Sequence, residues 1–238
     1  MTWKHGTWLG LDVETTGLQA GKDRVVQVGA ARMVADASTG ARELGSRAGV
    51  HEIVDHLLNP GIPIPESATA VHGITDADVA DALTWDEDRG NGASLADNLI
   101  SEVRRADALV GYNWPFDAGF LEAELGQRWT EAIEGKPILD PLVVVRFDDV
   151  GRYWRGKGRH KLEAVAARLG VERPHGKAHT AGYDAALALN VLDKLAVYLP
   201  DDGAEATALI ERERKRQDEN FKAWLSRQKA RDAAQEGA

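Results

Sequence analysis

Apolar residues gather in four short segments that have the composition of β-strands. They cover residues 7–13, 24–34, 50–58 and 108–112, and the second is rich in β-branched side chains. The segment 59–65 contains three prolines, which exclude both a helix and a central strand. We therefore expect a turn and an extended connection there.

A helical spacing of apolar positions appears mainly in the later parts of the chain. The predicted helices cover residues 94–105, 115–125, 162–169 and 181–198. Pro115 suits the first turn of its helix, because its missing N–H would have no partner at that position. Gly170 is well placed to end the third helix. Strands come first and then alternate with helices, which favours an α/β fold with a mixed sheet covered by helices.

The end of the chain has helical propensity but is mostly charged. Its apolar stripe is thin and consists of Phe221, Trp224 and Leu225, spaced i, i+3, i+4. We interpret residues 1–200 as one domain and residues 201–238 as a charged helical C-terminal extension. For the apolar stripe we favour packing on the body of the domain over the docking of a partner protein.

Composition limits the chemistry that the chain can perform. Of 238 residues, 43% are hydrophobic and 28% are charged, as in an ordinary globular protein. The absence of cysteine excludes disulfides, thiol catalysis and zinc–thiolate sites. The net charge of −9 argues against a sequence-reading DNA-binding protein, but it permits an enzyme whose carboxylates hold metal ions. No apolar run approaches the ~18 residues of a membrane span, and no signal peptide is evident, so we expect a cytoplasmic protein.

Two carboxylates stand close together at the end of the first predicted strand. Asp12 and Glu14 share one face of the strand, because side chains alternate with a period of two, while Leu11 and Val13 point to the other face. Two such charges repel by about 4 kcal/mol at ~4 Å and an effective dielectric constant near 20. A divalent cation would offset this repulsion. Alone, the pair is more typical of a solvated strand end than of a metal site.

Two further acids lie near the starts of predicted helices. Asp117 falls in a first turn, where the helix dipole alone favours a carboxylate by ~0.3–1 kcal/mol. His179 and Asp184 would not share a helix face, because five residues turn by about 500°. We therefore place His179 on a loop, Thr180 at the N-cap and Asp184 one turn into the helix, directed towards the sheet.

The three motifs are informative in combination. Asp-x-Glu-Thr-Thr-Gly on the first strand, Asn-x-x-Phe-Asp at a later helix start and His-x4-Asp before the last core helix resemble the DEDDh (DnaQ-like) 3′–5′ exonucleases. That superfamily contains the proofreading epsilon subunit of bacterial DNA polymerase III, and residues 59–75 are similar to epsilon-type members. The resemblance covers about residues 7–199. It implies a ribonuclease H-like mixed five-stranded sheet flanked by helices.

The resemblance also implies roles for the acidic residues. Asp12, Glu14, Asp117 and Asp184 would hold two Mg²⁺ or Mn²⁺ ions, which are hard cations that prefer oxygen ligands. Asp12 would bridge the ions, Glu14 and Asp184 would complete the water-binding site, and Asp117 would hold the other ion. His179 would be the general base. The implied reaction is metal-dependent hydrolysis from the 3′ end of single-stranded DNA, releasing nucleoside 5′-monophosphates in proofreading or repair.

Residues around these motifs are candidates for contact with the substrate. They are Thr15, Thr16, Leu18, His72, Asn113, Phe116, Arg155 and Lys157. Leu18 is a candidate wedge between the last two bases. His72 equally suits a loop-packing role, and Phe116 is more simply a core residue. Arg155 and Lys157 belong to a basic segment with interleaved aromatic residues, which suits a single strand or a solvated loop equally.

Two other functions fit the same residues. One is a 3′–5′ exoribonuclease of the same superfamily, which would have identical acids. The other is a catalytically idle module that docks on a polymerase, against which the intact acids and His179 argue. For the active enzyme, a DNA polymerase or another replication protein is the partner that the C-terminal helix would bind.

Overall fold

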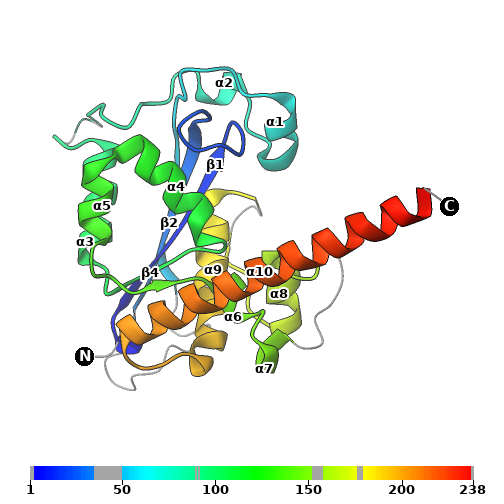
Figure 1. Ribbon diagram of the computed structural model, residues 1–238. Coiled ribbons are helices and arrows are strands. Elements are labelled where there is room, and N and C mark those ends of the chain that lie inside the picture. The colour runs from blue at the N-terminus through cyan, green and yellow to red at the C-terminus, as the bar shows by residue number, and fades with distance from the viewer. Residues whose placement is uncertain are drawn as a thin grey trace.

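A mixed sheet forms the centre of the molecule. The computed structural model describes residues 3–34, 50–88, 90, 92–151, 158–175 and 179–236. Within these residues the sheet has five strands in the order β3-β2-β1-β4-β5 (Figure 1). The strands are β1 (Thr7–Thr15), β2 (Val25–Val34), β3 (Val50–Leu57), β4 (Ala108–Val110) and β5 (Ile138–Leu139). The neighbours β1, β2 and β3 are antiparallel, whereas β4 runs parallel to both β1 and β5.

Helices cover both faces of this sheet. The described helices are α1 (Glu66–His72), α2 (Asp76–Val79), α3 (Leu95–Arg105), α4 (Trp114–Leu125), α5 (Gln127–Ile133), α6 (Pro141–Val144), α7 (Asp148–Gly151), α8 (Leu162–Leu169), α9 (Ala181–Leu195) and α10 (Gly203–Glu236), with 3-10 turns at Trp3–His5 and Ala196–Tyr198. One core cluster joins α6, α8, α9 and the start of α10 to Trp8 and Met33 of the sheet. A second joins α3, α4 and α5 to Leu9 and Leu11 on the opposite face.

The structure confirms the α/β class and the elements predicted from the apolar pattern. The left-handed Gly170 ends α8, and Pro115 lies in the first turn of α4, as expected. The predicted helix over 181–198 is α9 followed by a 3-10 turn. The pattern did not indicate β5, because a strand of two residues is too short to show a period.

The first half of α10 belongs to the core. Ala206 and Ile210 are fully buried against the same cluster as α9. The Thr207 hydroxyl accepts a hydrogen bond from the Ile138 amide of β5 at 3.0 Å. The start of the expected extension is therefore integrated with the sheet. In the part of the chain that the structure describes, no helix is long and apolar enough to cross a membrane.

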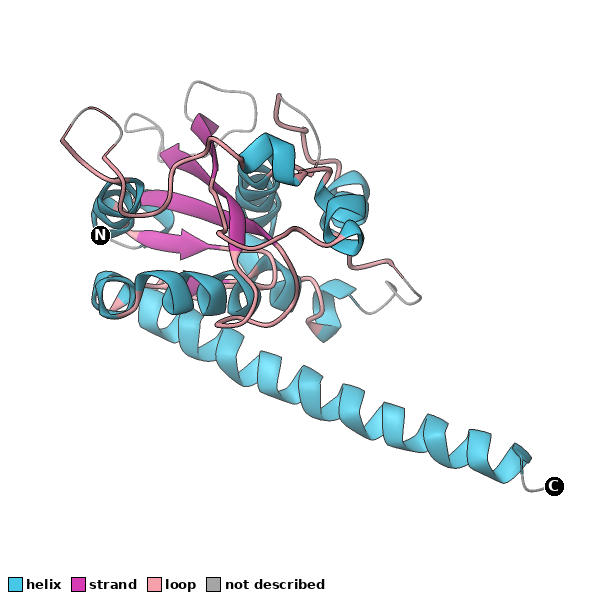
Figure 2. Cartoon of the chain, turned by 90° about the horizontal axis from the view of Figure 1, so that it is seen from above, coloured by secondary structure: helices cyan, strands magenta, loops and turns pink. Residues whose placement is uncertain are grey.

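The second half of α10 extends away from the body of the molecule (Figure 2). Phe221, Trp224 and Leu225 are 58%, 47% and 37% exposed, so the preferred expectation that they pack on the domain is wrong. The rings of Phe221 and Trp224 stack on each other, with centroids 5.8 Å apart. The stripe fails to reach the core because the helix has already passed the edge of the domain.

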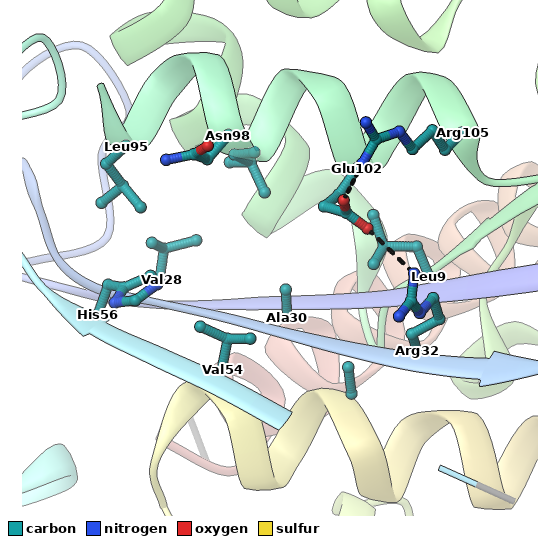
Figure 3. Close-up of a pocket in the computed structure, with 12 residues that line it drawn as sticks. Leu9, Val28, Ala30, Arg32, Val54, His56, Leu95, Asn98, Glu102 and Arg105 are labelled. Carbon is teal, nitrogen blue, oxygen red and sulfur yellow. Dashed lines mark hydrogen bonds and ion pairs between the residues drawn. The ribbon is translucent and has the colours of Figure 1, made fainter. Parts of the chain in front are cut away.

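A cavity of about 640 Å³ lies between the sheet and α3 (Figure 3). Its floor is apolar and includes Leu9 and Val28. At one end Glu102 pairs with Arg105 at 2.9 Å and with Arg32 at 3.7 Å. None of the predicted site residues lines this cavity.

Candidate active site

Three carboxylates meet at the end of β1. The pleat of β1 buries Leu11 and Val13 on one face and directs Asp12 and Glu14 to the other. On that face the start of α9 lies against the strand, with Asp184 in its first turn. Ligand oxygens of Asp12, Glu14 and Asp184 all lie within 4.8 Å of one another. This spacing would allow the three residues to share a divalent cation.

A glycine in β2 permits the close approach of α9. Gly29 lies opposite Asp12 in the sheet register. A Cβ atom at Gly29 would lie 2.0 Å from both the Ala181 carbonyl carbon and the Gly182 nitrogen, a distance that real Cβ atoms do not show. Only glycine therefore lets the first turn of α9 rest directly on the strand, which brings Asp184 to the β1 acids.

Side chains from the sheet also hold the first amides of α9. Gln27 Oε1 of β2 accepts a hydrogen bond from the Ala181 amide at 3.0 Å, and the Asp55 carboxylate of β3 accepts one from the Gly182 amide. Thr180 is the N-cap, as predicted, and accepts from the Tyr183 amide at 3.4 Å. Three otherwise unpaired N–H groups are thereby satisfied, which fixes the orientation of the turn that carries Asp184.

Asp117 approaches the cluster from the opposite side of the sheet. It lies in the first turn of α4, is 2% exposed, and accepts a hydrogen bond from the Val13 amide at 3.1 Å. It is not one of the three acids within 4.8 Å. Its charge nevertheless contributes to the raised pKa of Asp12. The charge of Asp117 therefore acts on the cluster that the other three predicted acids form.

The acids are poorly stabilised as anions by the protein alone. Burial, together with the charges of Asp184 and Asp55, raises the pKa of Glu14 to about 7. Burial also raises the pKa of Asp184, and the His179 charge acts in the opposite direction, which leaves the value at about 6. For Asp12, burial and then the Asp117 charge raise the pKa well above its usual range. A site of this kind, composed of carboxylate oxygens, suits hard divalent cations such as Mg²⁺ or Mn²⁺.

Two residues beside the acids have strained backbones. His179 and Asn113 have φ values of 65° and 74°, and no other non-glycine residue has a positive φ in the described part of the chain. Conformations of this kind cost about 1–3 kcal/mol and concentrate at functional sites. His179 immediately precedes the N-cap of α9, and Asn113 begins α4. Each strained residue therefore stands at the start of a helix that carries one acid.

The other predicted contacts lie in varied environments. Thr15 and Thr16 are buried at the end of β1, whereas the Leu18 side chain is 84% exposed. His72 is buried, and its Nδ1 accepts a hydrogen bond from the Ile74 amide at 3.0 Å. Burial lowers the pKa of His72, and the adjacent Thr15 backbone partly opposes this. His72 therefore lies beside the end of β1.

The remaining candidates separate into core, surface and undescribed positions. The Phe116 ring packs against Phe120, with centroids 5.0 Å apart, and contributes to the core. Asn113 is exposed. Arg155 and Lys157 lie outside the described residues.

Three polar residues near the site were not indicated by the sequence pattern. Gln27 and Asp55 hold α9, and Asp140 holds the start of α4 through the Asn113 and Trp114 amides. Asp140 offered a partial signal, because an aspartate before Pro141 is a typical helix N-cap. Its contact with α4 could not be inferred from that signal.

Comparison with known proteins identifies relatives of the domain. A family model described as Exonuclease matches residues 9–192. A Rhodobacter capsulatus protein named DNA polymerase III subunit epsilon-like protein is 36% identical over 176 residues, which are 74% of this chain and 21% of that protein. A PolC-type DNA polymerase III of Streptococcus thermophilus is 28% identical over 185 residues, or 76% of this chain and 10% of the polymerase. The chain thus spans about a fifth or less of these relatives.

Solved structures share the fold at lower identity. Exonuclease X in complex with 5′-overhanging duplex DNA superposes with a TM-score of 0.57 at 19% identity, covering 85% of this chain and 99% of that one. E. coli exonuclease I in complex with a dT13 oligonucleotide gives a TM-score of 0.59 at 20% identity, covering 79% and 40%. These likenesses establish the ribonuclease H-like architecture.

Proposed function

This chain belongs to the exonuclease family, and we propose that it is a two-metal-ion 3′–5′ exonuclease that degrades single-stranded DNA to nucleoside 5′-monophosphates. The observation that carries the proposal is the convergence of Asp12, Glu14 and Asp184 within 4.8 Å, with Asp117 beside them. The raised pKa values of Glu14 and Asp184 support it, because bound cations would stabilise their charged forms.

Each acid has a defined part in this proposal. Asp12, Glu14 and Asp184 would hold the ion at which water is bound, and Asp12 with Asp117 would hold the second ion. When bound, the two ions supply activation of the attacking water and stabilisation of the departing 3′ oxygen. The hydrogen bond from the Val13 amide would hold the Asp117 carboxylate against the end of β1.

His179 is the general base in this proposal. Its side chain is exposed, and it stands next to the cap of the helix that carries Asp184. In this role the neutral imidazole accepts the proton of the attacking water and then releases it to solvent.

The terminal nucleotide would lie over the end of β1. There, Thr15, Thr16 and His72 border the acids, and the highly exposed Leu18 is free to insert between the last two bases. Asn113 and Phe116 would complete this pocket, and Arg155 and Lys157 would contact the phosphates further along the strand. The DNA complexes of exonuclease X and exonuclease I support a DNA substrate.

Proofreading or repair is the proposed biological role. Two of the similar proteins are named as an epsilon-like protein of DNA polymerase III and as a PolC-type DNA polymerase III, which supports this role. The exposed Phe221, Trp224 and Leu225 on the projecting half of α10 form an apolar patch that would dock on a DNA polymerase or another replication protein.

The decisive test uses 5′-labelled single-stranded DNA and RNA of equal sequence, with Mg²⁺, Mn²⁺ or chelator. We expect a ladder shortened from the 3′ end of DNA that disappears with chelator and in Asp12→Ala. Glu122→Gln is the matched control, because Glu122 is an exposed acid on α4. Preferred degradation of RNA would favour the exoribonuclease. If a folded wild-type protein shortens neither DNA nor RNA, the docking module is favoured.

A further inference from the structure

A buried carboxylate outside the metal-binding acids holds the start of α4. Asp140 follows β5, precedes α6 and is 1% exposed. Its Oδ1 accepts hydrogen bonds from the Asn113 amide at 3.1 Å and the Leu142 amide at 2.9 Å. Its Oδ2 accepts from the Trp114 amide at 3.0 Å. One carboxylate therefore joins α6 to the turn at which α4 begins.

The start of α4 depends on this carboxylate because it lacks a cap of its own. Asn113 occupies the N-cap position with a left-handed φ of 74°, and its side chain makes no capping hydrogen bond. Instead, the Asp140 carboxylate, which belongs to a distant segment of the chain, accepts hydrogen bonds from the free amides. Asp117 lies only three residues beyond Trp114, so the direction of its side chain follows the orientation of this turn.

The counter-charge for Asp140 comes from α10. Arg214 Nη2 donates a hydrogen bond to Asp140 Oδ2 at 3.0 Å, across 74 positions of sequence. The Arg214 side chain is 25% exposed, so this ion pair is largely shielded from water. Burial raises the pKa of Asp140, and Arg214 and the three amides act in the opposite direction. Arg214 therefore helps to keep the carboxylate in the acceptor form that the α4 amides require.

We propose that Asp140 and Arg214 are positioning residues for Asp117, which link the C-terminal helix to the metal site. This inference rests on the proposed function, because it assumes that Asp117 is a metal ligand. Neither Asp140 nor Arg214 would contact the ions or the substrate. Their effect is transmitted by the Asn113–Trp114 turn, which sets where the Asp117 carboxylate stands at the end of β1. The Arg214 side chain thus links α10 to the site through the Asp140 carboxylate.

The test compares two arginines of α10 in the full-length protein. Arg214→Met removes the buried ion pair, whereas the control Arg216→Met removes a partly exposed arginine that pairs with exposed Asp148 and with Glu213. Mn²⁺ binding is measured by calorimetry, with kcat and KM on single-stranded DNA. For Arg214→Met we expect Mn²⁺ binding and kcat to fall by about 10-fold or more, in the range seen when groups that orient metal ligands are removed. KM should change little, and Arg216→Met should match the wild type.

A double-mutant cycle separates positioning from general damage to the fold. In an Asp117→Asn background, Arg214→Met should cause no further loss of Mn²⁺ affinity, because the ligand that it positions is already absent. An equal loss in both backgrounds would overturn the proposal. Arg214→Lys should recover part of the affinity through its charge. If Arg214→Met does not fold, the same cycle with Arg214→Lys decides the question.

Asp117→Asn alone distinguishes the metal site from the positioning role. If it weakens Mn²⁺ binding and Arg214→Met does not, the positioning role is wrong and the metal site stands. If Asp117→Asn leaves Mn²⁺ binding unchanged, Asp117 is not a ligand, and both the assignment of the second ion and the positioning role fail.

Discussion

The helices α9 and α4 each deliver one acid to the site, but their first turns are secured in different ways. The start of α9 has its own N-cap, Thr180, and two further acceptors from the sheet, Gln27 and Asp55. The start of α4 has no side-chain cap and relies on Asp140, which is paired with Arg214. Three side chains therefore hold the first turn of α9, whereas a single carboxylate accepts the first amides of α4.

This difference predicts unequal sensitivity to substitution. Removal of one acceptor at α9 leaves two others in place, so we expect it to lower mainly the free energy of unfolding. Removal of the Asp140–Arg214 pair disturbs the one carboxylate that accepts both the Asn113 and the Trp114 amides in the described structure. For α4 we therefore expect substitution to weaken mainly metal binding and turnover.

The largest expected effect at the start of α9 comes from His179. His179→Ala should lower kcat by about 10²–10⁴-fold, which is the usual contribution of a general base, while Mn²⁺ affinity stays near that of the wild type. Single-turnover rates and calorimetry measure the two quantities. His175→Ala is the control, because His175 is an exposed histidine of the preceding loop. Loss of Mn²⁺ binding in His179→Ala would instead assign this residue to the metal site.

An intermediate effect is expected from pH in the absence of metal. The pKa values of Glu14 and Asp184 are raised from 4.5 to about 7 and from 3.8 to about 6. The folded protein therefore retains protons that the unfolded chain has released, and the contribution of these groups to stability is lost as pH rises from about 4 to about 7. In chelator, the melting temperature should be lower at pH 7.5 than at pH 5.5, and Mn²⁺ should restore most of the difference.

Glu14→Gln provides the control for this pH effect. The variant lacks one of the titrating groups, so its melting temperature should depend less on pH in chelator than that of the wild type. An unchanged pH dependence in Glu14→Gln would show that other groups cause the effect. Failure of Mn²⁺ to raise the wild-type melting temperature at pH 7.5 would count against cation binding at these acids.

The smallest effect is expected from the local cap of α9. Thr180→Ala should lower the free energy of unfolding by about 1 kcal/mol, which corresponds to ~2–4 °C in melting temperature. Turnover should fall less than in Arg214→Met, because Gln27 and Asp55 still hold the turn. Thr75→Ala, at the cap of α2, is the stability control. A larger loss of turnover in Thr180→Ala than in Arg214→Met would reverse the comparison between the two helices.

Local patterns in the sequence determined much of the framework. The alternation along β1 separated Asp12 and Glu14 from Leu11 and Val13, and the structure shows the same separation. The cap at Thr180 was also predictable, because the capping hydroxyl and the amide that donates a hydrogen bond to it lie within a few residues of each other. The ordered motifs predicted the family, which the match over residues 9–192 confirms.

Only the tertiary structure decided how the helices are held against the site. Gln27 and Asp55 reach α9 across 154 and 127 positions of sequence, and Arg214 reaches Asp140 across 74. The same holds for α10, where Ile210 is buried and Phe221 is exposed although both are apolar residues of one helix. Hydrophobic periods and capping motifs encode contacts within about one turn of helix or along one strand, and a single sequence therefore reveals them. Contacts between distant segments depend on how the sheet and helices are arranged in space, and a local sequence pattern does not indicate that arrangement.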